Sequence, residues 1–508
     1  MPREQSTWAV PSPQNLGAST HFAEPGIILT AMVAMKTTYS VVFLSIIAAL
    51  SALSSSHAAP LHLPSGRSGA AGRALSEAGA AATASAQRRI ALCPSFDPDS
   101  DACAIDEGGR VFCWAGPALY SLTSWALPTL PAGAPPSYSR YIPMPGDREA
   151  VAIRTGPHHV CALLVGGGIA CWGSASRGEL GYPAGTDTFR GPAHCGLVPL
   201  PPGTHAVDIA LVERATCALL NTSQVLCWGL AQGGRLGYDS ELSDTSASSP
   251  ADLPFVPLPG NQVAKSIAGG PQLMCAILQS DDLYCWGPGA DPSIGLAGRA
   301  DGALLTQFPG NASVASVSVG GTKTCAITTE RQFYCWGGFR NRAVGDSLNP
   351  LLPEGTYPLS VSAGHDHECA LLNTQAVLCW GRNGNGQLGQ NTSDPYALVP
   401  LSRSLAPFYL LGQNATAVAA GSRATCIRLA NSDILCYGRG AGGMLGNGNV
   451  FDLGDGGLSR PVGVKGFVAD TAKGDVGVTA LSVGSSAGSE FHACAIYVDH
   501  TLRCWGLN

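Results

Sequence analysis

Charged side chains are scarce in this chain of 508 residues. Asp, Glu, Lys and Arg together make up 13% of it, against about 25% in ordinary soluble domains. The formal net charge is −6, and basic residues gather no more densely than in Arg88-Arg89. Binding to nucleic acid through phosphate contacts needs a basic patch, so the composition predicts no nucleic-acid partner.

Catalytic signatures are missing as well. The sequence contains no Gly-x-Ser-x-Gly elbow, P-loop, His-Glu-x-x-His motif or kinase signature, the short motifs that most often mark an active site. Acidic residues such as Asp281, Asp282, Glu330 and Asp433 fall in expected turns, where a solvated surface role is the default. We expect no enzymatic activity and no cofactor.

What the chain does have is one cysteine spacing used eight times. In each copy nine residues separate two cysteines, and the residue after the second is Trp in seven copies and Tyr437 in the other. Sixteen of the eighteen cysteines obey this spacing. The pairs are Cys103/Cys113, Cys161/Cys171, Cys217/Cys227, Cys275/Cys285, Cys325/Cys335, Cys369/Cys379, Cys426/Cys436 and Cys494/Cys504. Such regularity predicts a repeat protein.

Each cysteine pair is expected to lie in a β-hairpin. The segment from Cys217 to Cys227 is apolar at both ends and polar in the middle, which is typical of two strands joined by a turn. An odd number of intervening residues suits a three- or five-residue loop. Opposed Cβ atoms lie within about 4.5 to 5.5 Å, close enough for a disulfide. We predict one structural disulfide per repeat and no metal, because zinc ribbons and fingers use the shorter Cys-x2-4-Cys spacing.

Two more short segments precede each hairpin. A Pro/Gly-edged apolar run such as residues 198–203 comes first, and an alternating stretch such as residues 206–210 follows. Alternation with period two indicates a strand. Four short strands per unit, with 44 to 68 residues between successive first cysteines, match a β-propeller blade. We therefore expect an all-β fold with little helix.

The repeat resembles a known superfamily. Its markers are the lead-in Ala363-Gly-His-Asp-His367, the Trp-Gly end of the hairpin and the later Gly386-Gln-Leu-Gly389. Together they resemble the regulator-of-chromosome-condensation (RCC) repeat superfamily over residues 60–508. In detail the chain is most similar to the secreted, cysteine-paired ectodomains of plant Crinkly-type receptor kinases, although no transmembrane helix or kinase follows Asn508.

The resemblance implies a single β-propeller with four-stranded blades and one disulfide per blade. The hairpin count gives eight blades, whereas propellers of this superfamily typically have seven. The last unit lacks a Pro-edged strand, and residues 60–66 near the start of the repeat region have that pattern. We expect this N-terminal strand to close the ring and remove an open sheet edge.

The N-terminal region points to secretion. Residues 35–59 combine a short basic start, an apolar core and a small-residue cleavage site near Ala58 or Ala59, which is typical of a signal peptide. An uncleaved signal anchor is the rival interpretation. Residues 1–34 carry no folding pattern and are either an unstructured extension or a mis-assigned start, with translation beginning at Met35. No membrane span is expected in the mature chain.

The cysteines and four glycosylation sequons agree with an extracellular or cell-surface location. Disulfides persist in oxidising compartments and are rare in the cytosol. Each sequon is an Asn followed by x-Ser or x-Thr and could carry a glycan. The four acceptors are Asn221, Asn311, Asn391 and Asn414.

Repeated aromatic and histidine residues have two interpretations each. The Trp after each second cysteine could stack on a ligand, but a Trp at one position of every blade favours packing between blades. His159, His367 and His492 each stand two residues before a first cysteine. Equivalent positions are spread around a ring, so structural hydrogen bonding is favoured over a shared metal site.

Irregular insertions are the candidate partner-binding segments. Residues 115–145 contain Tyr120, Trp125, Tyr138 and Tyr141 among prolines, and aromatic residues are enriched at protein interfaces. A merely longer connection is the alternative. Cys93 and Cys195 lie outside the repeat spacing and are expected to pair with each other or with a partner chain.

The sequence therefore predicts a secreted or cell-surface propeller that binds a protein or peptide without chemistry of its own. Two alternatives stay open, because fold does not fix function. One is a guanine nucleotide exchange factor or adaptor for a small GTPase, a role that the resembled superfamily includes and that would require free thiols. The other is a secreted enzyme with an unrecognised site on one propeller face.

Overall fold

The computed structural model describes residues 90–92, 102–106, 108–114, 140–182, 189–190, 195–238, 249–288, 303–306, 308, 311–337, 352, 354–389, 410, 412–431, 433–440, 445, 478–484, 492–497 and 502–506. The chain divides into two compact units, Met1–Ala80 and Ala81–Asn508. All described residues belong to the second unit, so the expected signal peptide and the proposed closing strand at residues 60–66 lie outside them.

The described strands form eight antiparallel sheets, which we number 1 to 8 in chain order. Sheet 1 comprises β1 (Ile90–Leu92), β2 (Ala102–Ile105), β3 (Val111–Trp114) and β4 (Arg140–Ile142). Sheet 2 comprises β5 (Ala150–Thr155), β6 (His159–Leu164), β7 (Ile169–Ser174) and β8 (Phe189–Arg190). Sheet 3 comprises β9 (Ala206–Val212), β10 (Ala215–Leu220) and β11 (Val225–Gly229). Sheet 4 comprises β12 (Ala264–Gly269), β13 (Met274–Leu278), β14 (Leu283–Trp286) and β15 (Ala303–Thr306).

The remaining sheets have three described strands each. Sheet 5 comprises β16 (Val314–Val319), β17 (Lys323–Thr328) and β18 (Phe333–Gly337), and sheet 6 comprises β19 (Pro358–Ala363), β20 (His367–Leu372) and β21 (Val377–Gly381). Sheet 7 comprises β22 (Ala415–Ala420), β23 (Ala424–Leu429) and β24 (Ile434–Gly438), and sheet 8 comprises β25 (Val478–Val483), β26 (His492–Tyr497) and β27 (Leu502–Gly506). A fourth strand is thus described in three of the eight sheets.

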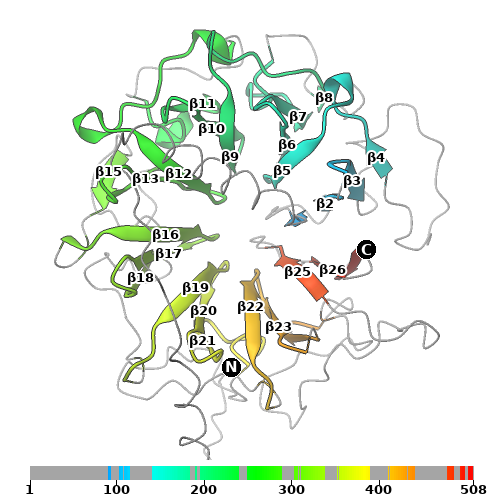
Figure 1. The fold of residues 1–508 in the computed structure, drawn as a ribbon, viewed down its shortest axis with the longest axis vertical. Coiled ribbons are helices and arrows are strands. Elements are labelled where there is room, and N and C mark those ends of the chain that lie inside the picture. The colour runs from blue at the N-terminus through cyan, green and yellow to red at the C-terminus, as the bar shows by residue number, and fades with distance from the viewer. Residues whose placement is uncertain are drawn as a thin grey trace, which may run out of the picture. The chain divides into compact units, whose positions relative to one another are not determined.

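The eight sheets stand side by side in a closed ring (Figure 1). The first strands of successive sheets contact one another around its centre, as β5 contacts β9 and β19 contacts β22. The ring closes where β1 contacts both β25 and β26, and these strands come from opposite ends of the propeller sequence. The structure thus decides between seven and eight blades in favour of eight.

The second and third strands of every sheet form the expected cysteine hairpin. Cys217 stands opposite Cys227 in the ladder, and the other seven pairs have the same register. A gap of nine residues therefore places the two cysteines directly across from each other, as the sequence predicts.

Disulfides join the opposed cysteines. Sheets 1 to 7 have one each, with the two Cα atoms 4.0 to 4.1 Å apart. In sheet order they are Cys103/Cys113, Cys161/Cys171, Cys217/Cys227, Cys275/Cys285, Cys325/Cys335, Cys369/Cys379 and Cys426/Cys436. Cys494 of sheet 8 is also disulfide-bonded, and Cys504 is the residue across from it.

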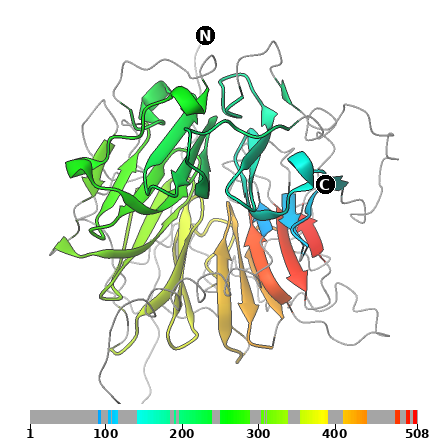
Figure 2. The ribbon, with the colours of Figure 1, turned by 45° about the horizontal axis from the view of Figure 1, so that its top comes forward.

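The hydrophobic cores lie between sheets. One cluster joins sheets 2 and 3 and contains Leu163, Ile209 and Trp228, and the next joins sheets 3 and 4. Because each sheet buries both of its surfaces, strands such as β6 and β20 are buried at all six positions instead of alternating between buried and exposed. Figure 2 shows the sheets standing side by side around the ring.

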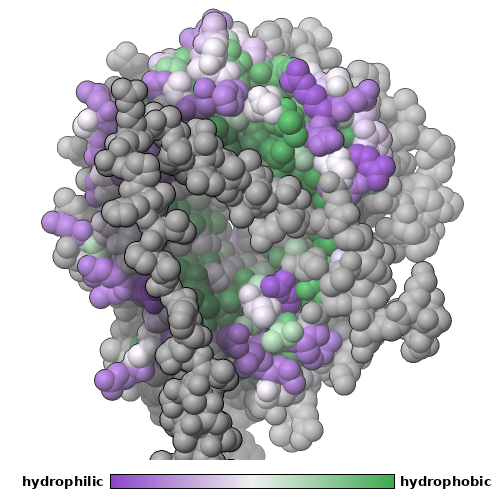
Figure 3. Space-filling model, in the orientation of Figure 1, coloured by the Kyte–Doolittle hydropathy of each residue, from purple (hydrophilic) through white to green (hydrophobic). Residues whose placement is uncertain are grey.

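The ring has two faces that carry different turns. The tips of the cysteine hairpins define the hairpin face, where Ala206 at the start of β9 donates its N–H to the carbonyl of Gly167 in the tip of sheet 2, at 2.9 Å. The turns between first and second strands define the turn face, where Thr322 N–H donates to His365 O at 3.1 Å. In the view of Figure 3, hydrophilic side chains gather at the rim and hydrophobic ones towards the hollow centre.

Candidate functional site

The paired cysteines lie inside the packed sheets and take no part in a site. All fourteen that form the disulfides of sheets 1 to 7 are at most 7% exposed. The second cysteines of six of these hairpins show the range: Cys113 (7%), Cys171 (0%), Cys285 (1%), Cys335 (7%), Cys379 (1%) and Cys436 (1%). A disulfide sulfur offers no thiolate, the form of cysteine that binds metals and attacks substrates. These cysteines are therefore structural.

The tryptophans that follow the second cysteines are packed between the sheets. Trp172, Trp228, Trp286 and Trp336 are at most 3% exposed, so these side chains are closed to a ligand in solution. Trp228 also donates its indole N–H to the carbonyl of Glu179, at 3.1 Å. The packing interpretation is therefore correct for these four residues.

Two of the repeated histidines make the same buried hydrogen bond to the neighbouring sheet. His159 Nε2 of sheet 2 lies 2.7 Å from Thr216 Oγ1 of sheet 3, and His367 Nε2 of sheet 6 lies 2.8 Å from Thr425 Oγ1 of sheet 7. Each Thr hydroxyl lies one residue before a first cysteine and donates in turn to a carbonyl, that of Glu179 for Thr216. The structural role expected for these histidines agrees with this arrangement, whereas the side chain of His492 lies outside the description.

Burial keeps both imidazoles neutral. The pKa of His159 is lowered to about 3 and that of His367 to about 4, chiefly because the surrounding core cannot solvate an imidazolium. A neutral imidazole can exchange a hydrogen bond with Thr without a buried charge. These histidines are therefore fixed contacts between sheets.

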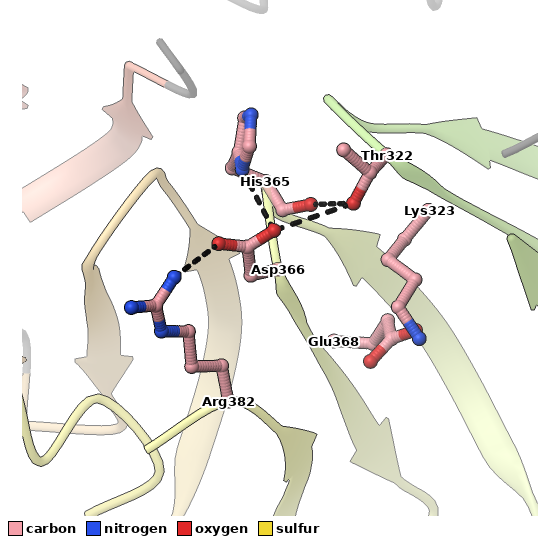
Figure 4. Close-up of polar contacts among 6 residues, drawn as sticks. All are labelled: Thr322, Lys323, His365, Asp366, Glu368 and Arg382. Atoms are coloured by element: carbon pink, nitrogen blue, oxygen red, sulfur yellow. Dashed lines mark hydrogen bonds and ion pairs between the residues drawn. The ribbon is translucent and has the colours of Figure 1, made fainter. Parts of the chain in front are cut away.

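Between sheets 5 and 6 the same two positions carry an ion pair. Lys323 stands two residues before Cys325, at the position of His159 in sheet 2 and His367 in sheet 6. Glu368 stands one residue before Cys369, at the position of Thr216 in sheet 3 and Thr425 in sheet 7. Lys323 Nζ lies 3.1 Å from Glu368 Oε1. Figure 4 shows the two side chains meeting between the sheets.

Glu368 is buried at the contact. Its side chain is 1% exposed, against 21% for Lys323, and its second oxygen, Oε2, has no hydrogen-bond partner among the described residues. Burial raises the pKa of Glu368, while the Lys323 ammonium acts against this rise. Since an unpaired buried carboxylate is costly, Glu368 depends on Lys323.

A second polar cluster lies directly above this pair on the turn face (Figure 4). Asp366 accepts from His365 Nδ1 at 2.9 Å and pairs with Arg382 Nη1 at 3.3 Å, and Thr322 Oγ1 of sheet 5 donates to the His365 carbonyl. Burial opposes ionisation of Asp366, but its contacts with His365 and Arg382 outweigh this and lower its pKa. The cluster holds the turns of sheets 5 and 6 together.

Arg382 is the member of this cluster that faces solvent. Its side chain is 45% exposed, whereas that of Asp366 is 9% exposed, so a partner could reach the guanidinium. Arginine forks suit carboxylate and backbone acceptors of a protein partner. Within the parts of the chain that the structure describes, no three His, Cys, Asp or Glu side chains are placed to hold a metal ion.

Comparison with known proteins agrees with this geometry. Family profiles described as the "Regulator of chromosome condensation (RCC1) repeat" match residues 359–387 and 376–427. The crystal structure of Prp20p from Saccharomyces cerevisiae superposes on 82% of this chain and 93% of its own, with 18% identity and a TM-score of 0.55. The chain is an RCC1-like β-propeller.

Two other similarities are weaker. The guanine nucleotide exchange factor SRM1 of Saccharomyces cerevisiae is 27% identical over 204 residues, which cover 37% of this propeller chain and 38% of SRM1. The chain thus matches well under two thirds of that relative's length. The Crinkly ectodomain of the receptor kinase ACR4 from Arabidopsis thaliana covers 69% of this chain and 94% of its own at 17% identity, with a TM-score of 0.39, which supports no argument.

The structure describes one of the four aromatic residues proposed from the sequence as a partner-binding loop. Tyr141 of β4 is 48% exposed, and its ring centroid lies 5.9 Å from that of Phe112 on β3. Tyr120, Trp125 and Tyr138 lie outside the described residues, so the loop stays a prediction.

The structure describes some of the remaining residues proposed from the sequence, the cysteines outside the repeat spacing and the sequon acceptors. Cys195 is a free, half-buried thiol whose pKa burial raises to about 11, and Cys93 lies outside the description. Three of the sequon acceptors, Asn221, Asn311 and Asn414, are exposed, and Asn391 is not described. A disulfide between Cys93 and Cys195 is therefore untested.

Sequence reasoning missed the pair of Lys323 and Glu368. Its signal was available in the repeat alignment, because Lys replaces His at one position and Glu replaces Thr at the other. The two positions are 45 residues apart in the chain, and their contact becomes visible only when adjacent blades are stacked. The expectation of little helix is confirmed for the described residues, where only short 3-10 turns such as Pro145–Asp147 accompany the strands.

Proposed function

We propose that this protein is a secreted or cell-surface propeller that binds a protein or peptide partner without catalysing a reaction. The observation that carries the proposal is the series of seven hairpin disulfides, one in each of sheets 1 to 7. Bonds of this kind persist in oxidising compartments. Together with the signal-peptide pattern at residues 35–59, they favour the secretory pathway.

The scaffold role is supported by how the polar side chains are used. His159, His367 and Glu368 serve contacts between sheets and are buried, so these groups hold the ring together. Exposed side chains such as Arg382 and Tyr141 vary from blade to blade. A rigid ring with variable turns can present one specific surface to a partner.

Proteins with similar folds also bind protein partners. The structure report for Prp20p names binding to Gsp1p and histones, and another similar structure shows yeast RCC1 bound to Kap60, with a TM-score of 0.52. Those partners belong to those proteins. For the present chain the exchange-factor alternative is second, because it requires reduced cysteines. Separately, none of the helices in the described residues is long and apolar enough to span a bilayer.

The test is to express the full chain with a C-terminal tag in its native host and compare medium, cell surface and lysate. We expect the protein in the first two fractions, starting near Ala59 or Pro60 and with oxidised cysteines. Surface crosslinking should then capture a partner whose recovery falls with Arg382→Glu. An intracellular, reduced protein that accelerates nucleotide release from a small GTPase would refute the proposal.

A further inference from the structure

Four of the exposed hydrophobic side chains gather around one hairpin tip. Six large hydrophobic residues are exposed in the described part of the chain, and four of them lie on or near sheet 2. We name these four the aliphatic cluster. They are Val151 (45% exposed), Val165 (52%), Leu197 (40%) and Val207 (49%).

Contacts of the tip place the segments that carry these residues next to one another. Val165 lies in the tip and donates its N–H to Glu149 O, just before Val151, at 2.8 Å. A Cβ on Gly168 would stand 3.2 Å from Leu197 Cδ2, and one on Gly167 would stand 2.6 Å from the carbonyl of Ala206, beside Val207. The cluster thus continues from sheet 2 to sheet 3 on the hairpin face. Single exposed valines are common, but four exposed aliphatic side chains on adjoining segments of one face suggest a surface that is normally covered.

A glycosylation acceptor stands at the border of the cluster. Asn221 lies at the hairpin tip of sheet 3, and its N–H donates to His205 O at 2.9 Å. Its side-chain Oδ1 accepts from His205 N–H at 3.0 Å. His205 lies two residues before Val207 and packs on Gly167 of the neighbouring tip. The first bond holds the backbone of Asn221, and the second holds its side chain, beside the segment that carries Val207.

The same bonds leave the reactive atom available. An N-linked glycan is attached to the amide nitrogen of Asn in Asn-x-Ser/Thr, and here the hydrogen bond to His205 uses the amide oxygen. Asn221 is exposed, and Ser223 completes its sequon. The Asn221 tip can therefore carry a glycan with its observed conformation unchanged.

We propose that Asn221 carries an N-linked glycan that covers the aliphatic cluster and keeps the hairpin face of sheets 2 and 3 from associating with other molecules. The proposal rests on the proposed passage through the secretory pathway. Pyranose rings present C–H faces that pack on aliphatic side chains while their hydroxyls stay hydrated, so the glycan is an occupant suited to this surface. Its consequence is that partners bind elsewhere, with the turn face and Arg382 the open candidates.

The chain offers a matched control. Asn311 is likewise exposed and begins the sequon Asn311-Ala-Ser313 on the hairpin face. Three residues later, Val314 donates its N–H to the carbonyl of Asp281 in the tip of sheet 4, at 2.7 Å. Asp281 pairs with Lys265 at the start of β12, and the six exposed large hydrophobic residues of the described part include none from this segment. Ser223→Ala and Ser313→Ala each abolish one sequon while leaving the Asn and the backbone carbonyl at the changed position in place.

The experiment compares these two variants with the wild-type protein, each secreted by the native host. Glycopeptide mass spectrometry reads sequon occupancy, anilinonaphthalene sulfonate fluorescence reads exposed apolar surface, and light scattering reads association. We expect Ser223→Ala to raise dye fluorescence severalfold and to self-associate, while Ser313→Ala matches wild type. Adding Val165→Thr and Val207→Thr to Ser223→Ala should restore wild-type behaviour.

Two results would overturn the proposal. One is a secreted protein with a glycan at Asn311 and none at Asn221, which would leave the cluster free for a protein partner. The other is a Ser223→Ala variant that behaves like Ser313→Ala. In both cases the proposed function stands, whereas an unsecreted chain with no sequon occupied would refute the proposed function together with this inference.

Discussion

Single residues at the contacts between sheets decide how this ring responds to pH. His159 and His367 are buried and neutral, each hydrogen-bonded to a Thr of the next sheet. Their pKa values of about 3 and about 4 lie below the ordinary value of 6.5. Between roughly pH 6.5 and 4 the unfolded chain therefore binds protons that the folded chain does not bind, so stability is lost as pH falls through this range.

Removing both buried histidines should weaken this loss of stability at low pH. A variant with both His159→Gln and His367→Gln should lose less stability than wild type when the pH falls from 7 to 4.5. The expected difference is about 1.4 kcal/mol per histidine for each pH unit below 6.5. Urea unfolding with intact disulfides measures it, and His205→Gln, an exposed site, is the control. Parallel pH profiles for wild type and the double variant would contradict the prediction.

The second prediction concerns the pair between sheets 5 and 6. Lys323→Met should destabilise the protein by about 3 kcal/mol at pH 7, because it leaves the buried Glu368 carboxylate without its cation. The loss should be smaller at pH 5, since a raised pKa favours the neutral acid. Denaturant midpoints at the two pH values measure both effects.

Replacing the ion pair by a His–Thr contact is the control for the position between sheets 5 and 6. Combining Lys323→His with Glu368→Thr recreates the contact seen between sheets 2 and 3 and between sheets 6 and 7. The double variant should be more stable than either single variant and close to wild type. Additive single effects in a double-mutant cycle would show that the two positions are not coupled.

At the scale of the element, the turn after each first strand limits how closely sheets approach. Gly320 begins this turn in sheet 5 and Gly156 begins it in sheet 2, both donating N–H to a carbonyl three residues later. A Cβ on Gly320 would stand 2.1 Å from Gly364 O, a backbone atom of sheet 6, whereas one on Gly156 would make ordinary contacts at 3.4 Å. Backbone cannot move aside without separating the sheets.

The third prediction uses these two glycines as a matched pair. Gly320→Ala should lower stability by at least about 1 to 3 kcal/mol, the usual cost of overpacking. Gly156→Ala should be close to neutral, because it also reduces the entropy of the unfolded chain. Thermal and urea unfolding of both variants would test this, and equal losses would argue against close packing at the turn of sheet 5.

Elements with a short, regular signature could be predicted from the sequence. The nine-residue gap between Cys217 and Cys227 predicted a hairpin with opposed cysteines, and the ladder has that register. Contacts between sheets could not be predicted from the sequence. Lys323 and Glu368 belong to different repeats, and each looks like an ordinary surface residue in its own strand. Likewise, the space around Gly320 depends on the approach of sheet 6.

At the scale of the whole molecule, the repeat number decided the ring size. Eight hairpins gave eight sheets, and the contact of β1 with β25 and β26 closes the circle. The strand at residues 60–66 proposed to complete the last blade lies outside the described residues and stays a prediction. The binding-scaffold function stays a proposal, and the sequence names no partner because Tyr120, Trp125, Tyr138 and Tyr141 do not specify what would bind them.

We propose above that this ring is a disulfide-bonded protein of the secretory pathway. The most direct test of this proposal is non-reducing peptide mass spectrometry of the protein isolated from its native host, reading the N-terminus, the cysteine pairing and the four sequons together. We predict a mature start near Ala59 or Pro60 and eight disulfides, each between the two cysteines of one hairpin. An intact N-terminus with free thiols at those cysteines would show that the protein does not pass through the secretory pathway.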